Sequence, residues 1–305
     1  RIDDASGRYI EYVKNTLPKN ITLEGLKVVI DCANGAAYKI GPTVLWELGA
    51  EVISLNVTPD GTNVNKNSGS TNPKNLISTV KKTKADLGIA LDGDADRCVL
   101  VDDKGRIVNG DLILGIIATK WKNKNILKNN TVVGTHMTNS ALVKYLEKNN
   151  INFIRVDVGD RNIIKEMKKN NFVLGGEPSG HIILSNMSSS GDGLLASLEV
   201  LYTLKESKKK LSSFTNLFRP IPQITQSFFI SKNNTAEKIL NKLKPALYNL
   251  KESSKSDNRL IIRKSGTENK IRVMIESREK NFAKKIILKT KKILKDLNKW
   301  LNPHV

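Results

Sequence analysis

One short segment of the chain carries three carboxylates at alternate positions between two apolar runs. The segment reads Asp92-Gly93-Asp94-Ala95-Asp96-Arg97. Residues 87–91 before it and residues 98–101 after it are apolar, and runs of this length predict buried strands. Three negative charges this close repel one another unless a cation neutralises them. The segment therefore predicts a divalent-metal site, with Asp92, Asp94 and Asp96 as ligands, in a tight turn between two strands.

Two other interpretations of this segment have to be weighed. An EF-hand calcium loop requires glycine at the position of Arg97, glutamate at the position of Asp103, and a helix on each side. The sequence meets none of these conditions. An acidic surface turn that binds no metal stays open as the alternative.

The net charge of +20 raises the question of a nucleic-acid partner. Aromatic residues make up only 5% of the chain and do not alternate with the basic clusters, as a platform that stacks single-stranded bases would require. No helix-turn-helix or zinc-finger spacing appears. Lysines that alternate with Ile and Leu, as in residues 284–289, are typical of the polar face of an amphipathic helix. We expect no nucleic-acid partner, and a basic nucleic-acid-binding protein is the alternative from a different class.

The compartment follows from the apolar runs and the cysteines. No apolar run approaches the length of a membrane span, so we expect no membrane partner. Cys32 and Cys98 both lie in or beside strand-like apolar runs, which indicates buried thiols rather than a disulfide framework. A reducing compartment, the cytoplasm, is the expectation.

Strand and helix patterns alternate along most of the chain, which predicts α/β layers. Pro220 and Pro222 mark a linker, and the pattern after them is that of a small α+β unit. We expect three domains, with boundaries at residues 1–106, 107–219 and 220–305.

A second segment rich in charged and hydroxyl side chains lies in the last of these domains. It reads Arg263-Lys264-Ser265-Gly266-Thr267-Glu268-Asn269 and stands between two strand patterns. A glycine turn lets successive N–H groups converge, Ser265 and Thr267 add hydroxyl donors, and Arg263 adds a planar fork suited to phosphate. Arg272 alternates with the apolar residues of the next strand and can point toward the same anion. The alternative is a plain hairpin turn.

A third segment is the polar run Gly175-Gly176-Glu177-Pro178-Ser179-Gly180-His181. Glu177, Ser179 and His181 suit hydrogen bonding to vicinal sugar hydroxyls, and His181 could also take part in proton transfer. The alternative is a glycine-rich turn whose histidine is only structural.

Taken together, the order and content of the three segments resemble the α-D-phosphohexomutases over essentially the whole chain. Residues 29–36, 158–161 and 191–193 also resemble that family. The resemblance implies two consecutive α/β mixed-sheet domains followed by a small α+β C-terminal domain. It assigns one Mg2+ to Asp92, Asp94 and Asp96, and a catalytic role to Arg97 and His181. The substrate contacts that it implies are Glu177, Ser179, His181, Arg263, Ser265, Gly266, Thr267, Asp160, Arg161 and Arg272.

The activity that the resemblance implies is transfer of a phosphoryl group between O6 and O1 of a hexose phosphate. A phosphoserine and a hexosamine 1,6-bisphosphate intermediate, which also acts as activator, would carry the transfer. Residues 59–65, 69–71 and 263–268 favour glucosamine as the sugar, with glucose or mannose as the alternative. The implied partner is a small sugar phosphate, and the resemblance allows a homodimer.

Family members begin with a further α/β domain whose serine relays the phosphoryl group within a Ser-His-Asn run. The histidines here are His136, His181 and His304, and none follows a serine. Residues 1–12 resemble the start of the family's second domain. We therefore expect a fragment that holds domains two to four, is inactive alone, and keeps weak affinity for hexose phosphates.

Overall fold

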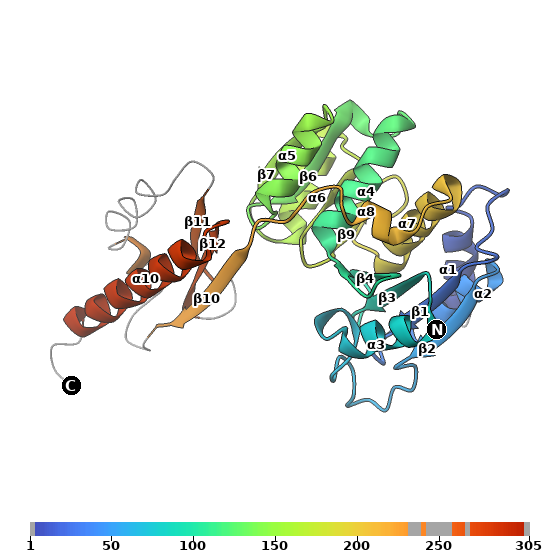
Figure 1. Ribbon diagram of the computed structural model, residues 1–305, viewed down its shortest axis with the longest axis horizontal. Coiled ribbons are helices and arrows are strands. Elements are labelled where there is room, and N and C mark those ends of the chain that lie inside the picture. The colour runs from blue at the N-terminus through green and yellow to red at the C-terminus, as the bar shows by residue number, and fades with distance from the viewer. Residues whose placement is uncertain (1–3, 231–238, 242–257, 266–268, 302–305) are drawn as a thin grey trace. The chain divides into compact units, whose positions relative to one another are not determined.

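A computed structural model gives the structure, which describes residues 4–230, 239–241, 258–265 and 269–301. The chain divides into two compact units, residues 1–219 and 220–305 (Figure 1). The first unit holds two mixed α/β sheets with helices, and the second holds a small sheet with helix α10. The fold class expected from the sequence is therefore confirmed.

The first sheet has five strands in the order β2-β1-β3-β4-β5. β1 pairs in parallel with β2 and β3, whereas β3, β4 and β5 pair antiparallel. β3 and β4 are buried at every position, because helices cover this part of the sheet and no face is left for polar residues. The strands are β1 (Lys27–Asp31), β2 (Glu51–Leu55), β3 (Leu87–Leu91), β4 (Cys98–Asp102) and β5 (Ile107–Val108). The helices are α1 (Ala5–Lys14), α2 (Ile40–Glu47), η1 (Gly69–Thr71) and α3 (Lys74–Thr83).

The second sheet has four strands in the order β7-β6-β8-β9. β6 pairs in parallel with β7 and β8, and β8 pairs antiparallel with β9. The strands are β6 (Thr131–Thr135), β7 (Asn152–Val156), β8 (Leu174–Gly176) and β9 (Ile182–Leu184). The helices are α4 (Gly110–Asn123), η2 (Lys128–Asn130), α5 (Ser140–Lys148), α6 (Asp160–Asn170), α7 (Gly193–Ser207) and α8 (Leu211–Phe214).

The two sheets share one topological pattern. In each, three parallel strands are followed by an antiparallel hairpin at the same side of the sheet. Residues 92–97, the aspartate loop, join β3 to β4 in the first sheet, and residues 177–181, the polar loop, join β8 to β9 in the second. The aspartate loop and the polar loop therefore occupy equivalent positions in their sheets. Gly175 and Gly176, expected in this loop from the sequence, belong to β8 instead.

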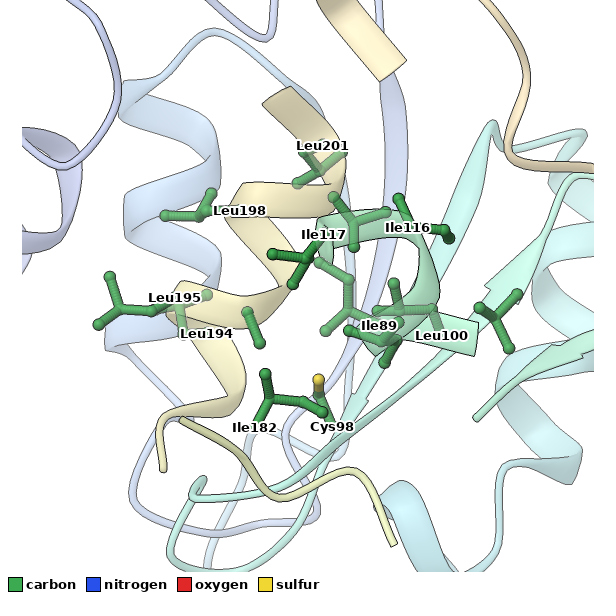
Figure 2. Close-up of a cluster of buried hydrophobic side chains, with 14 of the residues drawn as sticks. Ile89, Cys98, Leu100, Ile116, Ile117, Ile182, Leu194, Leu195, Leu198 and Leu201 are labelled. Atoms are coloured by element: carbon green, nitrogen blue, oxygen red, sulfur yellow. The ribbon is translucent and has the colours of Figure 1, made fainter. Parts of the chain in front are cut away.

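A single apolar core joins the two sheets. Figure 2 shows Ile89, Cys98 and Leu100 of the first sheet facing side chains of α4 and α7. Ile116 and Ile117 come from α4, and Leu194, Leu195, Leu198 and Leu201 come from α7; all six are at most 1% exposed. α7 contacts both β4 and β9. Because α7 and α4 pack on both hairpins, the two loops are held in a fixed relation to each other.

The C-terminal unit is a three-stranded antiparallel sheet with helix α10 (Lys280–Leu301). The strands are β10 (Gln223–Phe229), β11 (Arg259–Lys264) and β12 (Lys270–Glu276), with β12 in the centre. Ile271, Val273 and Ile275 alternate along β12 and share a core with Ile286 and Ile287 of α10. None of the helices within the described ranges is both long and apolar enough to cross a bilayer.

Both cysteines are buried and free. Burial raises the pKa of the Cys32 thiol to about 12, and it raises the pKa of the Cys98 thiol to the same value. A thiol with so high a pKa carries almost no thiolate near neutral pH, which makes it a poor nucleophile. The expectation of two buried thiols is confirmed.

Candidate metal and sugar-phosphate site

The aspartate loop gathers its three carboxylates at one point. Asp92, Asp94 and Asp96 each offer an oxygen, and these oxygens lie within 4.8 Å of one another. Asp92 is fully buried, Asp96 is half-buried and Asp94 is exposed, so the cluster opens to solvent on one side. Alternate positions face the same way because Ala95, with φ of 61°, turns the backbone through the left-handed region between Asp94 and Asp96.

The charges in this cluster favour a bound cation. Burial raises the pKa of Asp92, and the neighbouring Asp96 and Asp94 raise it further, while the backbone N–H and charge of Arg97 oppose the rise. Oxygen-only carboxylate donors are the ligands that Mg2+ prefers, and its bonds of about 2.0–2.1 Å need only a small closure of the cluster. The residues present therefore fit a divalent magnesium ion.

Arg97 is the cation already present at the loop. Its Nε and Nη2 lie 2.7 and 2.6 Å from Asp92 Oδ2, and its backbone N–H donates to Asp92 Oδ1 at 3.0 Å. Its Nε also lies 3.4 Å from Asp96 Oδ1. The side chain is 41% exposed, so the guanidinium reaches solvent beside the carboxylates. Arg97 thus offers positive charge to an anion that approaches the metal ligands.

The turn that follows β1, residues 32–36, contacts the backbone of the aspartate loop. Ala36 N–H donates to the Gly93 carbonyl at 2.8 Å. A Cβ on Gly35 would lie 2.2 Å from the same carbonyl oxygen, so only glycine allows this approach. The two loops of the first sheet are therefore in direct backbone contact.

The polar loop lies directly against β4. Cys98 N–H donates to the Gly180 carbonyl at 3.1 Å. Gly180 has φ of +93°, and a Cβ there would lie 1.9 Å from the Cys98 carbonyl oxygen. A glycine is needed at this position for both reasons. The contact brings the 177–181 segment within reach of Arg97, which forms an antiparallel bridge with His181.

His181 connects the two loops through its side chain. Its Nδ1 lies 3.1 Å from Asp96 Oδ2, and the side chain is 8% exposed. Its ring packs on Gly191, where a Cβ would come within 2.4 Å of Nε2. Nε2 is buried and has no hydrogen-bond partner in the structure. The imidazole therefore holds the carboxylate of Asp96, a metal-ligand candidate, in place, and hydrogen bonds to ligating carboxylates are a common support in metal sites.

Glu177, Ser179, Asp160 and Arg161 form the rest of the predicted sugar contacts. Glu177 Oε1 accepts from the Gly159 N–H at 3.1 Å, and Ser179 Oγ lies 3.4 Å from Glu177 Oε2. Gly159 precedes α6, whose first residues are the exposed Asp160 and Arg161. The structure thus brings the 158–161 segment and the polar loop together, with Glu177 half-buried and Ser179 exposed to solvent.

A cavity of about 340 Å³ opens beside the carboxylates. Asp94, Ala95 and Asp96 form one wall, and the 190–192 segment forms another. Tyr9 of α1 and the turn after β1 close it. The metal-ligand candidates therefore border a hollow as well as open solvent.

The predicted phosphate segment lies in the C-terminal unit, between β11 and β12. Arg263 and Arg272 stand directly opposite each other in the antiparallel register. Ser265 is 8% exposed, and its N–H donates to the Lys270 carbonyl at 2.9 Å. Arg272 Nε is buried without a hydrogen-bond partner. Two arginines on opposed positions repel each other, and an anion between them would relieve this repulsion. Gly266 and Thr267 lie outside the described residues.

Sequence reasoning missed two residues that support the site. Tyr9 donates to Asp192 at 2.7 Å across a long sequence separation, and Asp31 accepts from the N–H groups of Ala33 and Gly69. Nothing local in the sequence pairs Tyr9 with Asp192. Asp31 could have been found, since a carboxylate at the end of a buried apolar strand needs partners.

Fold and site together define an α/β protein in which a loop with three converging carboxylates contacts the equivalent hairpin loop of a second mixed sheet. Residues 7–105, 109–221 and 231–291 match the profiles of phosphoglucomutase/phosphomannomutase alpha/beta/alpha domain II, alpha/beta/alpha domain III and the C-terminal domain. The chain belongs to the phosphoglucomutase/phosphomannomutase family. The resemblance inferred from the sequence is confirmed.

Relatives of established name are similar over almost all of this chain. The phosphoglucosamine mutase of Zymomonas mobilis is 49% identical over 287 residues, which are 94% of this chain and 64% of that protein. The phosphoglucosamine mutase of Rhizobium rhizogenes is 44% identical, with 94% and 63% covered. The chain thus spans less than two thirds of the length of these relatives.

Solved structures share the fold at low identity. A phosphoglucomutase/phosphomannomutase family protein from Burkholderia thailandensis has a TM-score of 0.78 at 20% identity, over 98% of this chain and 65% of that one. The N-acetylphosphoglucosamine mutase of Aspergillus fumigatus, in complex with GlcNAc-6P and magnesium, has a TM-score of 0.74 at 18% identity. That match covers 96% of this chain and 66% of the Aspergillus chain.

Proposed function

We propose that the enzyme to which these residues belong interconverts glucosamine 6-phosphate and glucosamine 1-phosphate. The observation that carries the proposal is the contact between two equivalent hairpin loops, one with three converging carboxylates and one with the polar side chains of Glu177, Ser179 and His181. In support, the relatives named phosphoglucosamine mutase are 43–49% identical to this chain. Glucose and mannose phosphates are the alternative substrates.

Asp92, Asp94 and Asp96 would hold one Mg2+ at the aspartate loop. When bound, the ion supplies positive charge that neutralises the oxygens of a phosphorylated serine. The chain's own contribution is to hold the carboxylates in their converged arrangement. Arg97 and His181 do this by binding Asp92 and Asp96.

Arg97 would stabilise the charge that develops on the phosphoryl group in transfer. Phosphoryl transfer asks little covalent work of a protein, so catalysis rests on positioning and charge neutralisation. The guanidinium is 41% exposed beside the carboxylates, which leaves donors free to reach an incoming phosphate.

The polar loop would bind the sugar. Glu177 and Ser179 can accept from and donate to vicinal hydroxyls, and Asp160 and Arg161 lie on the segment that Glu177 holds. The sequence favours both sugar binding and proton transfer for His181. Because its side chain is 8% exposed and contacts Asp96, its first role in this proposal is to fix the aspartate loop.

The turn between β11 and β12 would hold the phosphate that is not being transferred. Arg263, Ser265 and Arg272 supply charge and donors there, and Gly266 and Thr267 would add N–H and hydroxyl groups.

We also propose that hexosamine 1,6-bisphosphate is the intermediate and activator of the reaction. The chain is proposed to have three domains, bounded at residues 1–106, 107–219 and 220–305. A homodimer and a cytoplasmic location complete the proposal, the latter supported by the two buried thiols.

A substrate comparison tests this function. We propose a fusion protein in which the N-terminal domain of the Zymomonas mobilis relative precedes Arg1, assayed with Mg2+ and glucose 1,6-bisphosphate. The expected result is turnover of glucosamine 6-phosphate, with a higher kcat/KM than for glucose 6-phosphate or mannose 6-phosphate. A higher kcat/KM for either of the other sugars would replace glucosamine as the substrate, and the mutase class would stand.

A further inference from the structure

Tyr9 of α1 reaches across the first unit to the start of α7. Its hydroxyl donates to Asp192 Oδ2 at 2.7 Å. Both residues line the cavity beside the aspartate loop. Burial raises the pKa of the Tyr9 phenol, and the charge of Asp192 raises it further, so the hydroxyl keeps its proton and acts as a donor.

Asp192 connects Tyr9 to the aspartate loop through the first residues of α7. Its other oxygen, Oδ1, accepts from Leu195 N–H at 2.9 Å and so caps the N-terminus of α7. The next residue, Gly193, donates its N–H to the Ala95 carbonyl at 2.9 Å. A Cβ on Gly193 would lie 2.6 Å from the Arg97 carbonyl oxygen, so the start of α7 lies directly on the loop.

Ala95 is the point in the aspartate loop that most needs support. It lies between Asp94 and Asp96 and has φ of 61°, a left-handed conformation that is unfavourable for a residue with a Cβ. Any relaxation of Ala95 toward ordinary backbone angles would turn one neighbouring carboxylate away from the other. The Gly193 hydrogen bond opposes this relaxation, and the position of Gly193 depends on Asp192.

We propose that Tyr9 is a positioning residue, which through Asp192 and Gly193 holds Ala95 so that Asp92, Asp94 and Asp96 converge on one divalent cation. This inference rests on the proposed metal site. The inference adds Tyr9 of α1 to the residues that support the site. The Tyr9 hydroxyl contacts Asp192 and touches neither the metal nor the sugar.

The test replaces Tyr9 with phenylalanine, which removes only the hydroxyl. Mn2+ serves as the probe, and its affinity for the 305-residue chain is measured by isothermal titration calorimetry. We expect Tyr9→Phe to weaken Mn2+ binding about tenfold, the scale of losing an outer contact in a metal site. Tyr12→Phe on the same helix, where the side chain is 46% exposed, is the matched control and should leave the affinity unchanged.

A second variant tests whether Tyr9 acts through Asp192. In an Asp192→Ala background, which removes the acceptor of the Tyr9 hydroxyl, the added Tyr9→Phe change should have little further effect on Mn2+ affinity. Full additivity of the two changes would overturn the proposed route.

Hydrogen exchange separates failure of this inference from failure of the metal site. Without metal, Tyr9→Phe should speed amide exchange of Gly193 and of residues 92–97, and Tyr12→Phe should not. If the native chain binds no Mn2+ but exchange rises, the metal proposal is wrong and the support by Tyr9 stands. Unchanged exchange together with unchanged Mn2+ affinity overturns the role of Tyr9.

Discussion

Replacing Asp94 with asparagine is expected to lower the affinity of the chain for Mg2+ and Mn2+ roughly a hundredfold or more, because a charged ligand becomes a neutral one. Asp94 is the most informative of the three carboxylates. It is exposed, whereas Asp92 is buried and paired with Arg97, and Asp96 contacts His181. Asp94→Asn should therefore leave the metal-free fold intact, so that a change in affinity reports on the ligand itself.

Calorimetric titration with Mn2+, together with thermal unfolding, checks this result. Asp4→Asn removes the same charge from an exposed residue paired with Arg8, and it should change neither the affinity nor the Tm increase that Mn2+ produces. In the Asp94 variant the metal-free Tm should match that of the native chain and the increase should vanish. An Asp94 variant that binds Mn2+ as tightly as the native chain would leave the loop as an acidic surface turn.

Replacing Arg263 with alanine is expected to raise the KM for glucosamine 6-phosphate about 10- to 150-fold in the fusion protein defined above. A charge-assisted hydrogen bond to phosphate contributes about 1.5–3 kcal/mol. The substitution also leaves Arg272 opposite a small, neutral side chain, so the anion site loses one of its two paired positive charges. Because this anchor acts on substrate and transition state alike, kcat should change much less than KM.

Arg278→Ala is the matched control for this variant. Arg278 is an exposed arginine just beyond the opposite end of β12, so its loss changes the net charge equally without touching the turn. Its KM should stay at the native value, which excludes a general electrostatic effect of the basic surface. An equal rise in KM for both variants would mean that Arg263 acts only through long-range charge.

The aspartate loop could be predicted from the sequence because its signal is local. Three alternate carboxylates between two apolar runs indicate a turn between strands, and the structure has β3 and β4 on either side of it. The start of the polar loop is predicted less accurately. The sequence predicts Gly175 and Gly176 in the polar loop, but both are buried in β8, where Met167 and His181 leave no space for a side chain.

The relation between the two loops could not be read from the sequence. The two sheets repeat the same topology without a repeat in residue pattern, and packing of α4 and α7 on both hairpins sets the distance between them. The Asp96 contact with His181 and the Tyr9 contact with Asp192 both join residues far apart in sequence. Such pairs depend on the completed core, which local propensity does not determine.

Binding of glucosamine 6-phosphate to the 305-residue chain, mapped by backbone amide NMR with Mg2+ present, tests the central claim most directly. We expect the sugar phosphate to shift amides of residues 158–161 and 177–181, and in the C-terminal unit those of residues 263–267. The exposed lysines of residues 208–210 serve as the internal comparison and should not respond. Shifts confined to such lysine clusters, or no shifts at millimolar sugar phosphate, would contradict the claim that each of these loops binds sugar phosphate.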